Sequence, residues 1–283
     1  MKITIADPTG FCFGVQRAIN ALEVALCSSE AQGSVMSIGM PIHNPQEVER
    51  LKKLGLIVLD DASKVLEGAT VFIRAHGEPR SVYEELTSKN CRIIDATCPF
   101  VKRVQDKARE LTESGYSVIL LGDKNHPEVR SIVGHSINNI EVVKTPDEAE
   151  KLLPRSKIGV IAQTTQREED FKQLVYILQN KTNELEISNT ICQATVERQQ
   201  AVKRLADSVE GIIIVGGKNS ANTVKLYEIA KSRGTDAILV ESSEEMDGRW
   251  LKGKSIIGVA AGASTPEWLI ETICKAVAKM TVG

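Results

Sequence analysis

The sequence has few aromatic residues, little net charge and no long apolar run, and each absence excludes a class of protein. Phe, Trp and Tyr make up 4% of the 283 residues, too few to build stacking surfaces for nucleic-acid bases. Lys and Arg number 35 against 37 Asp and Glu, so the net charge of −2 gives no basic field for nucleic acid or a membrane surface. The longest apolar runs, such as 118–121 and 212–215, fall far short of a membrane span of ~20 residues. We therefore expect a soluble globular protein with no nucleic-acid or membrane partner.

A targeting segment is also missing, because Asp7 and Pro8 interrupt the short apolar stretch at the start. No two of the six cysteines have the C-x-x-C spacing of common metal motifs. In a chain without an export signal, cysteines are more typical of thiols or metal ligands than of disulfides. These features predict a cytoplasmic protein.

Short β-branched segments alternate with longer segments of helical periodicity along the chain. This alternation is typical of α/β lobes with mostly parallel, buried sheets. Strands are expected at 35–39, 70–75, 91–96, 117–122, 157–163, 211–217, 237–241 and 255–262, and helices at 15–26, 45–54, 101–111, 127–135, 196–206, 222–232 and 266–280.

A threefold internal repeat organises these segments. Each repeat begins with a cysteine that opens a helical segment, followed by a strand ending in glycine, a polar residue four positions later, and a second strand that ends at another polar residue. The members are Cys12, His43 and His76, then Cys98, His126 and Thr164, then Cys192, Ser220 and Ser264. We expect three pseudo-symmetric lobes: 1–97 with an N-terminal strand, 98–191, and 192–283 with a C-terminal helix.

The repeat predicts a site, because ligands of open α/β sheets bind beyond the carboxyl ends of the strands. Three lobes would direct three thiols and a polar ring at one central cavity. Asp95 and Asn189 are expected to cap the helices after two of these thiols. Three thiolates suit a soft metal, either an iron–sulfur cluster or zinc, and a missing fourth ligand is typical of a catalytic centre. Cys27, Cys91 and Cys274 lie in apolar contexts and are expected in the core.

The polar ring suits an anionic, phosphate-like ligand, because it offers many hydrogen-bond donors. Its members are His43, His76, His126, Ser220, Asn222 and Ser264. Glu128, two residues after His126, is either a proton donor or a solvated carboxylate in a first helical turn. Three functions fit: an iron–sulfur reductase, a zinc hydrolase in which Glu128 activates water, or a redox sensor without catalytic activity.

Nine segments in order resemble one family, the 4-hydroxy-3-methylbut-2-enyl diphosphate reductases, from about residue 3 to about residue 270. They are GFCFGVQRAI, PIHNPQEV, RAHGEP, DATCPFV, GDKNHPEV, AQTT, ICQAT-x-x-RQ, KNSAN and AGAST. The resemblance implies a three-lobed α/β fold around one [4Fe–4S] cluster per chain, with one open iron. By the same resemblance, the cluster ligands are Cys12, Cys98 and Cys192, and the diphosphate ligands are His43, His76, Ser220, Asn222 and Ser264.

The family activity implies a two-electron, two-proton removal of the substrate hydroxyl as water. This is the last step of the non-mevalonate isoprenoid pathway, and it gives isopentenyl or dimethylallyl diphosphate. Thr164 and Glu128 would lie beside the hydroxyl bound to the open iron, His126 would organise the site and help bind the diphosphate, and Glu128 would supply protons. Ferredoxin or flavodoxin is the implied electron donor. Ala221 departs from the family pattern NSSN and offers only its backbone N–H to a phosphate.

Overall fold

The computed structural model describes residues 1–28, 35–136 and 140–280. These residues form two compact units. The terminal unit comprises residues 1–16, 42–53 and 193–283, and the central unit comprises residues 17–41 and 54–192. Across the described ranges, no helix is both long enough and apolar enough to cross a membrane.

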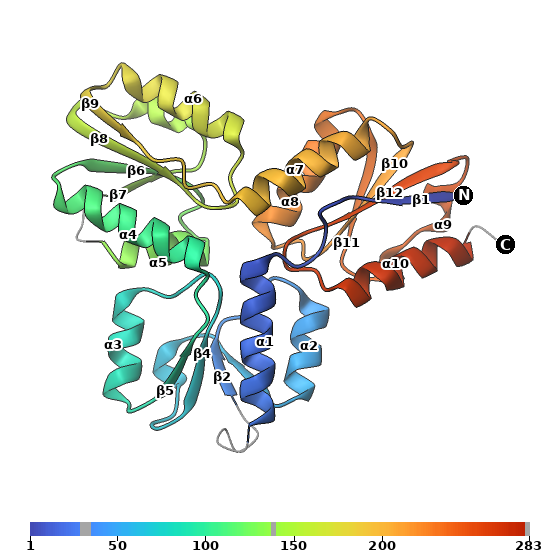
Figure 1. Cartoon of the computed structure of the whole chain (residues 1–283), viewed down its shortest axis with the longest axis horizontal. Coiled ribbons are helices and arrows are strands. Elements are labelled where there is room, and N and C mark those ends of the chain that lie inside the picture. Colours follow the sequence, from blue (N-terminus) through green and yellow to red (C-terminus); the bar gives the residue numbers. More distant parts are fainter. Residues whose placement is uncertain (29–34, 137–139, 281–283) are drawn as a thin grey trace. The chain divides into compact units, whose positions relative to one another are not determined.

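The terminal unit contains one parallel sheet of order β1-β12-β10-β11. Strand β10 is buried on both faces, since Ile212 and Ile214 pack with the helices α7 and α8 while Ile213 and Val215 pack with α10 (Figure 1). Burial on both faces explains the uninterrupted apolar sequence of this strand. The elements are β1 (Lys2–Ile5), α2 (Pro45–Lys53), α7 (Gln193–Ala206), β10 (Gly211–Val215), α8 (Ala221–Ser232), β11 (Asp236–Val240), η4 (Ser243–Glu245), α9 (Gly248–Leu251), β12 (Ile256–Ala261) and α10 (Glu267–Met280).

The central unit contains two parallel sheets, of order β3-β2-β4-β5 and β7-β6-β8-β9. In the second sheet, helices α4 and α5 pack against one face and α6 against the other. The helix α1 (Phe13–Cys27) enters this unit from residue 17 onward. The other elements are β2 (Val35–Ile38), β3 (Leu56–Leu59), η2 (Ala62–Lys64), β4 (Thr70–Ile73), α3 (Arg80–Ser88), β5 (Arg92–Asp95), α4 (Pro99–Glu113), β6 (Ser117–Leu121), α5 (Pro127–Gly134), β7 (Ile140–Val143), η3 (Pro146–Lys151), β8 (Arg155–Ala162), α6 (Glu168–Gln179) and β9 (Thr182–Ile187).

All three sheets share one topology. The first strand of each repeat lies between the second and the third, as in β3-β2-β4, β7-β6-β8 and β11-β10-β12. A fourth strand, β5, β9 or β1, pairs beside the third. The predicted class, three similar α/β lobes with parallel sheets, is confirmed.

The first strand, β1, was expected with the lobe of residues 1–97, and this assignment is wrong. It pairs with β12, and Lys2 lies opposite Ile256 in the register. Without β1, the edge of β12 would be left with unpaired backbone groups. Three further strands, β3, β7 and β9, have no counterpart among the expected segments. They lie at sheet edges, where partial solvent exposure permits charged residues such as those of TNELEI in β9. The lobe limits at 97/98 and 191/192 stay predictions.

Candidate active site

Each of the three repeat cysteines lies directly before a helix. Cys12 precedes α1, Cys98 precedes α4 and Cys192 precedes α7. A helix N-terminus carries partial positive charge, which stabilises a thiolate beside it. All three residues are partly exposed. The predicted placement of these thiols at helix starts is therefore present in the fold.

One main-chain contact positions the three cysteines in the same way. The backbone N–H of each donates to a carbonyl in the loop after the third strand of a sheet. The pairs are Cys12 to Ala263 (3.2 Å), Cys98 to Ala75 (2.9 Å) and Cys192 to Thr164 (2.9 Å). Each cysteine is thereby tied to the loop that carries Ser264, His76 or Thr164, the last polar residue of a repeat.

Asp95 and Asn189 do not cap the helices α4 and α7, contrary to expectation. Asp95 Oδ1 accepts a hydrogen bond from the Thr97 N–H at 2.9 Å, and Asn189 Oδ1 accepts one from the Ile191 N–H at 3.1 Å. Each side chain closes a turn over the two residues before a repeat cysteine. A short carboxyl or amide side chain reaches the N–H two residues on more readily than a donor inside the next helix.

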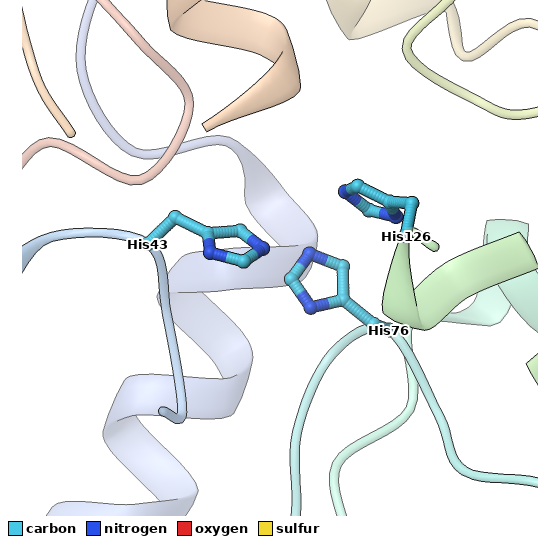
Figure 2. Close-up of side chains that lie close together, drawn as sticks. All are labelled: His43, His76 and His126. Atoms are coloured by element: carbon cyan, nitrogen blue, oxygen red, sulfur yellow. The ribbon is translucent and has the colours of Figure 1, made fainter. Parts of the chain in front are cut away.

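In the central unit, His76 and His126 face each other edge to face, with ring centroids 5.2 Å apart and ring planes at 83° (Figure 2). His126 is the N-cap of α5, and its Nδ1 accepts the Glu128 N–H at 3.1 Å. Because Nδ1 is an acceptor, the neutral His126 ring carries its proton on Nε2.

Glu128 is buried, with 1% of its surface exposed, and is held by Thr164. Its Oε1 accepts the Thr164 N–H at 2.7 Å, and its Oε2 accepts the Thr164 Oγ1–H at 2.9 Å. Burial raises the pKa of Glu128 to about 7, although the two hydrogen bonds from Thr164 act in the opposite direction. The carboxyl can therefore hold or release a proton near neutral pH, and the solvated-carboxylate alternative is wrong.

In the terminal unit, the backbone at His43 lies against Gly217. A Cβ added to Gly217 would come within 2.2 Å of the His43 carbonyl oxygen, so only glycine permits this approach. Ser264 Oγ donates to the same carbonyl at 3.4 Å. Together these contacts place the His43 loop beside the carboxyl ends of β10 and β12.

The N-terminus of α8 follows Gly217 and carries Ser220, Ala221 and Asn222. Ser220 is the N-cap, and its Oγ accepts the Thr223 N–H at 3.4 Å. Asn222 is 5% exposed, and among the described residues neither its Nδ2 nor its Oδ1 has a hydrogen-bond partner. A buried amide without partners is costly, so a polar ligand at this helix N-terminus would satisfy it.

Each unit thus gathers its own predicted residues. In the central unit, contacts run from the Cys98 backbone through the His76 loop to His126, Glu128, Thr164 and Cys192. The terminal unit connects Cys12, Ser264, His43, Ser220 and Asn222 through loop contacts at Ala263 and Gly217. The predicted convergence of all these residues on one cavity stays a prediction.

Comparison with known proteins identifies the family of this chain. A family model described as LytB protein matches residues 3–278. The chain belongs to the LytB protein family. It is 44% identical over 286 residues to the 4-hydroxy-3-methylbut-2-enyl diphosphate reductase of Aquifex aeolicus (strain VF5), covering 100% of this chain and 98% of the relative. The same-named protein of Geotalea uraniireducens (strain Rf4) is 40% identical over 280 residues, covering 99% and 98%.

Solved structures related to the LytB family also match over almost the whole chain. A structure of (E)-4-hydroxy-3-methyl-but-2-enyl diphosphate reductase, described as the terminal enzyme of the non-mevalonate pathway, is 43% identical with a TM-score of 0.72, covering 98% of this chain and 99% of that one. A reductase structure from Plasmodium falciparum is 29% identical with a TM-score of 0.90, covering 97% and 87%. The resemblance drawn from the nine segments is confirmed.

The three remaining cysteines of this LytB chain differ from one another. Cys91 and Cys274 are partly buried and pack against apolar clusters, in broad agreement with the expectation. Cys27 is exposed at the end of α1, so its expected core position is wrong. It is the last residue of the helix and does not lie on the buried face that includes Leu22 and Leu26.

Sequence reasoning missed Gln163, which links two loops of the site. Its side chain is 1% exposed; its Oε1 accepts the Asp123 N–H at 3.1 Å, and its Nε2 donates to Thr165 Oγ1 at 3.1 Å. It therefore ties the loop before His126 to the loop that carries Thr164. The signal in the sequence was its position in AQTT, directly after β8.

Proposed function

We propose that this protein is a [4Fe–4S] 4-hydroxy-3-methylbut-2-enyl diphosphate reductase. It removes the substrate hydroxyl as water with two electrons and two protons and releases isopentenyl or dimethylallyl diphosphate. The observation that carries the proposal is the buried Glu128, held by Thr164 and linked through His126 and His76 to the loops of two repeat cysteines. A buried carboxyl with a pKa of about 7 is suited to donate protons at physiological pH.

The three repeat cysteines fit the proposed cluster by their chemistry. They are thiols at helix N-termini, each fixed by its own backbone N–H, and thiolate is the usual protein ligand of iron–sulfur clusters. All six cysteines lie in the described ranges and none forms a disulfide. The cluster ligands would be Cys12, Cys98 and Cys192. When bound, such a cluster supplies electrons and, at its open iron, Lewis acidity toward the hydroxyl oxygen.

The diphosphate would bind at the N-terminus of α8. Asn222 brings an unsatisfied buried amide, Ser220 brings a hydroxyl, and Ala221 brings the backbone N–H of the first helical residue. By the family resemblance, we propose His43, Ser264 and His76 as further ligands of the diphosphate. Multiple neutral donors hold the phosphate oxygens in place without requiring a buried Lys or Arg.

The proton-transfer residues act at the hydroxyl end of the substrate. Thr164 uses its Oγ1–H and its N–H to orient the Glu128 carboxyl, and Glu128 donates its proton from a carboxyl oxygen to the leaving hydroxyl. His126, with its proton on Nε2, donates to the substrate. The carboxyl then takes up a second proton from solvent and supplies it, directly or through a substrate phosphate, to either end of the allyl group, which gives the two isomeric products.

We further propose that the electrons come from a ferredoxin or a flavodoxin, and that the enzyme acts in the cytoplasm. A reducing compartment keeps cysteine thiols reduced, as the three proposed cluster ligands require. The experiment is anaerobic purification, followed by iron and sulfide analysis and by turnover of the hydroxylated diphosphate with a chemical reductant. We expect four irons and four sulfides per chain and both isomeric products. A colourless, iron-free protein that cannot be reconstituted, or one that carries a single zinc, contradicts the proposal.

A further inference from the structure

Arg198, on α7, holds the loop that leads to Cys12. The side chain is 5% exposed. Its Nη2 donates to the carbonyls of Gly10 (2.9 Å) and Phe11 (3.0 Å), and its Nε also donates to Gly10 (3.3 Å). A further bond from Nη1 to the Ala194 carbonyl, at 3.0 Å, anchors the guanidinium to its own helix. Because the Phe11 carbonyl belongs to the same peptide as the Cys12 N–H, this contact acts directly on the ligand residue.

Arg17, on α1, makes the equivalent contact before Cys98. Its Nη2 donates to the carbonyls of Ala96 (3.1 Å) and Thr97 (2.6 Å), and Thr97 is the residue next to Cys98. The Arg17 side chain is exposed, whereas both acceptor residues are buried. Two of the three cysteine loops are therefore fixed by an arginine that binds two successive carbonyls.

The third cysteine loop is held differently. Before Cys192, the Thr190 hydroxyl accepts the Ala162 N–H at 2.8 Å and donates to the Ala162 carbonyl at 2.6 Å. Arg103, which is the fifth residue of α4 as Arg17 is of α1, is exposed and lies over the Phe100 ring at 5.3 Å. Arg103 therefore provides a matched control for Arg17.

We propose that Arg198 and Arg17 are positioning residues that hold Cys12 and Cys98 in the conformation that receives the metal cluster. The proposal rests on the proposed function. A guanidinium presents several N–H groups in one rigid plane and can bind neighbouring carbonyls together, which an ammonium group cannot match. Gly10 has a φ of +73°. Because glycine adopts other backbone conformations about as readily, the loop before Cys12 depends on such a restraint. Loops ordered in advance reduce the entropy lost when the cluster binds.

The test is amide hydrogen exchange, measured by mass spectrometry on cluster-free protein. In Arg198→Met, exchange should rise about tenfold or more in a peptide that covers residues 9–13, because bonds from a charged donor are lost. In Arg17→Met, the same change should appear over residues 95–99. Arg103→Met should change neither segment, and Arg198→Lys should lie between wild type and Arg198→Met.

A second measurement is the rate and stoichiometry of iron and sulfide uptake during reconstitution. We expect slower uptake in Arg198→Met and Arg17→Met, and wild-type uptake in Arg103→Met. The proposal would be overturned if exchange in Arg198→Met and Arg17→Met rose equally over the whole chain, with no larger rise in the cysteine loops. Wild-type uptake of iron and sulfide in both of these variants would also overturn it. If Arg198→Met does not fold, Arg198→Lys and the exposed Arg17→Met decide the question. Failure of the wild type to bind iron and sulfide would instead refute the proposed function, while the exchange data would still test the loop restraint.

Discussion

Glu128 is subject to two opposing effects whose balance sets its chemistry. Removal from water favours the neutral carboxyl, while the Thr164 N–H and Oγ1–H favour the carboxylate. The first effect is larger and leaves the pKa at about 7. At a pH near 7, a fully solvated glutamate would already have lost its proton. A buried glutamate without hydrogen-bond donors would hold the proton too tightly to donate it.

Glu128→Gln should retain the cluster and lose most of the turnover. The amide keeps the size and polarity of the carboxyl but cannot donate an acidic proton, and general acid catalysis contributes about 10²–10⁴-fold. The measurement combines the iron content with the single-turnover rate of the reduced enzyme. Glu113→Gln, at the exposed end of α4, is the control and should react like the wild type. A wild-type rate in Glu128→Gln would remove Glu128 from the reaction.

Glu128 also predicts a pH dependence of stability. The native pKa lies above the ordinary value of 4.5, so the native state binds the proton more tightly than the unfolded chain. The stability that this carboxyl contributes is fully present below pH 4.5 and is lost as the pH rises through about 7. The side chain of the Glu128→Gln variant does not titrate. The free energy of unfolding of this variant, relative to that of the wild type, should therefore rise by about 2–3 kcal/mol from pH 5 to pH 8.5. Urea unfolding of the cluster-free proteins at both pH values measures this difference; an equal difference at both would contradict the raised pKa.

At the scale of elements, the same arrangement of strand, loop, cysteine and helix occurs three times. A fourth strand of a sheet, β5, β9 or β1, is followed by a repeat cysteine and then by a helix. The cysteine N–H binds the loop after the neighbouring third strand. Parallel strands bring their carboxyl ends to one edge of a sheet, so each repeat cysteine lies beside the loop that follows a third strand.

Gly217→Ala should disturb this edge in the terminal unit. The new methyl group would come within 2.2 Å of the His43 carbonyl, so the His43 loop must move. We expect the KM for the diphosphate substrate to rise about tenfold or more, which corresponds to a loss of about 1.4 kcal/mol, while the iron content is unchanged. Gly248→Ala is the matched control, because nothing lies within 4 Å of its added Cβ. An unchanged KM in Gly217→Ala would show that the His43 loop does not contact the diphosphate.

Over the whole molecule, the six cysteines separate into different environments. The repeat cysteines are partly exposed at helix starts, Cys27 is exposed, and Cys91 and Cys274 pack against apolar clusters. Burial raises the pKa of the Cys274 thiol, which lowers its reactivity.

This distribution predicts how alkylation should depend on iron. In the cluster-loaded protein, iodoacetamide should modify Cys27 but not the three proposed ligands, because bound thiolates cannot react. Removal of iron should expose Cys12, Cys98 and Cys192, while Cys274 stays slow. Peptide mass spectrometry identifies each site, and Cys27 is the internal control in both samples. Equal labelling of a repeat cysteine with and without iron would exclude it as a ligand.

Much of this arrangement could be predicted from the sequence. Sheet interiors such as GIIIV in β10 are buried on both faces, and this constraint appears directly as an unbroken apolar run. The edge strands β7 and β9 were missed because charged residues interrupt that signal, whereas β3 was missed although its sequence LIVL is an unbroken apolar run. The turns before the polar residues could be predicted because they require glycine. The helices after the cysteines could be predicted because helix starts restrict the local sequence.

By itself, the sequence determined the threefold repeat and the α/β class and predicted candidate site residues, since these depend on local periodicity and spacing. Only the tertiary structure decided that β1 completes the sheet of β10–β12, because strand pairing joins residues more than 250 positions apart. The same is true of the Glu128 protonation, which depends on burial and on Thr164 from the loop after β8. Arg198 owes its role to a fold that brings it against Gly10 and Phe11. Desolvation and long-range contacts have no signature in local sequence, and they set the chemistry of this site.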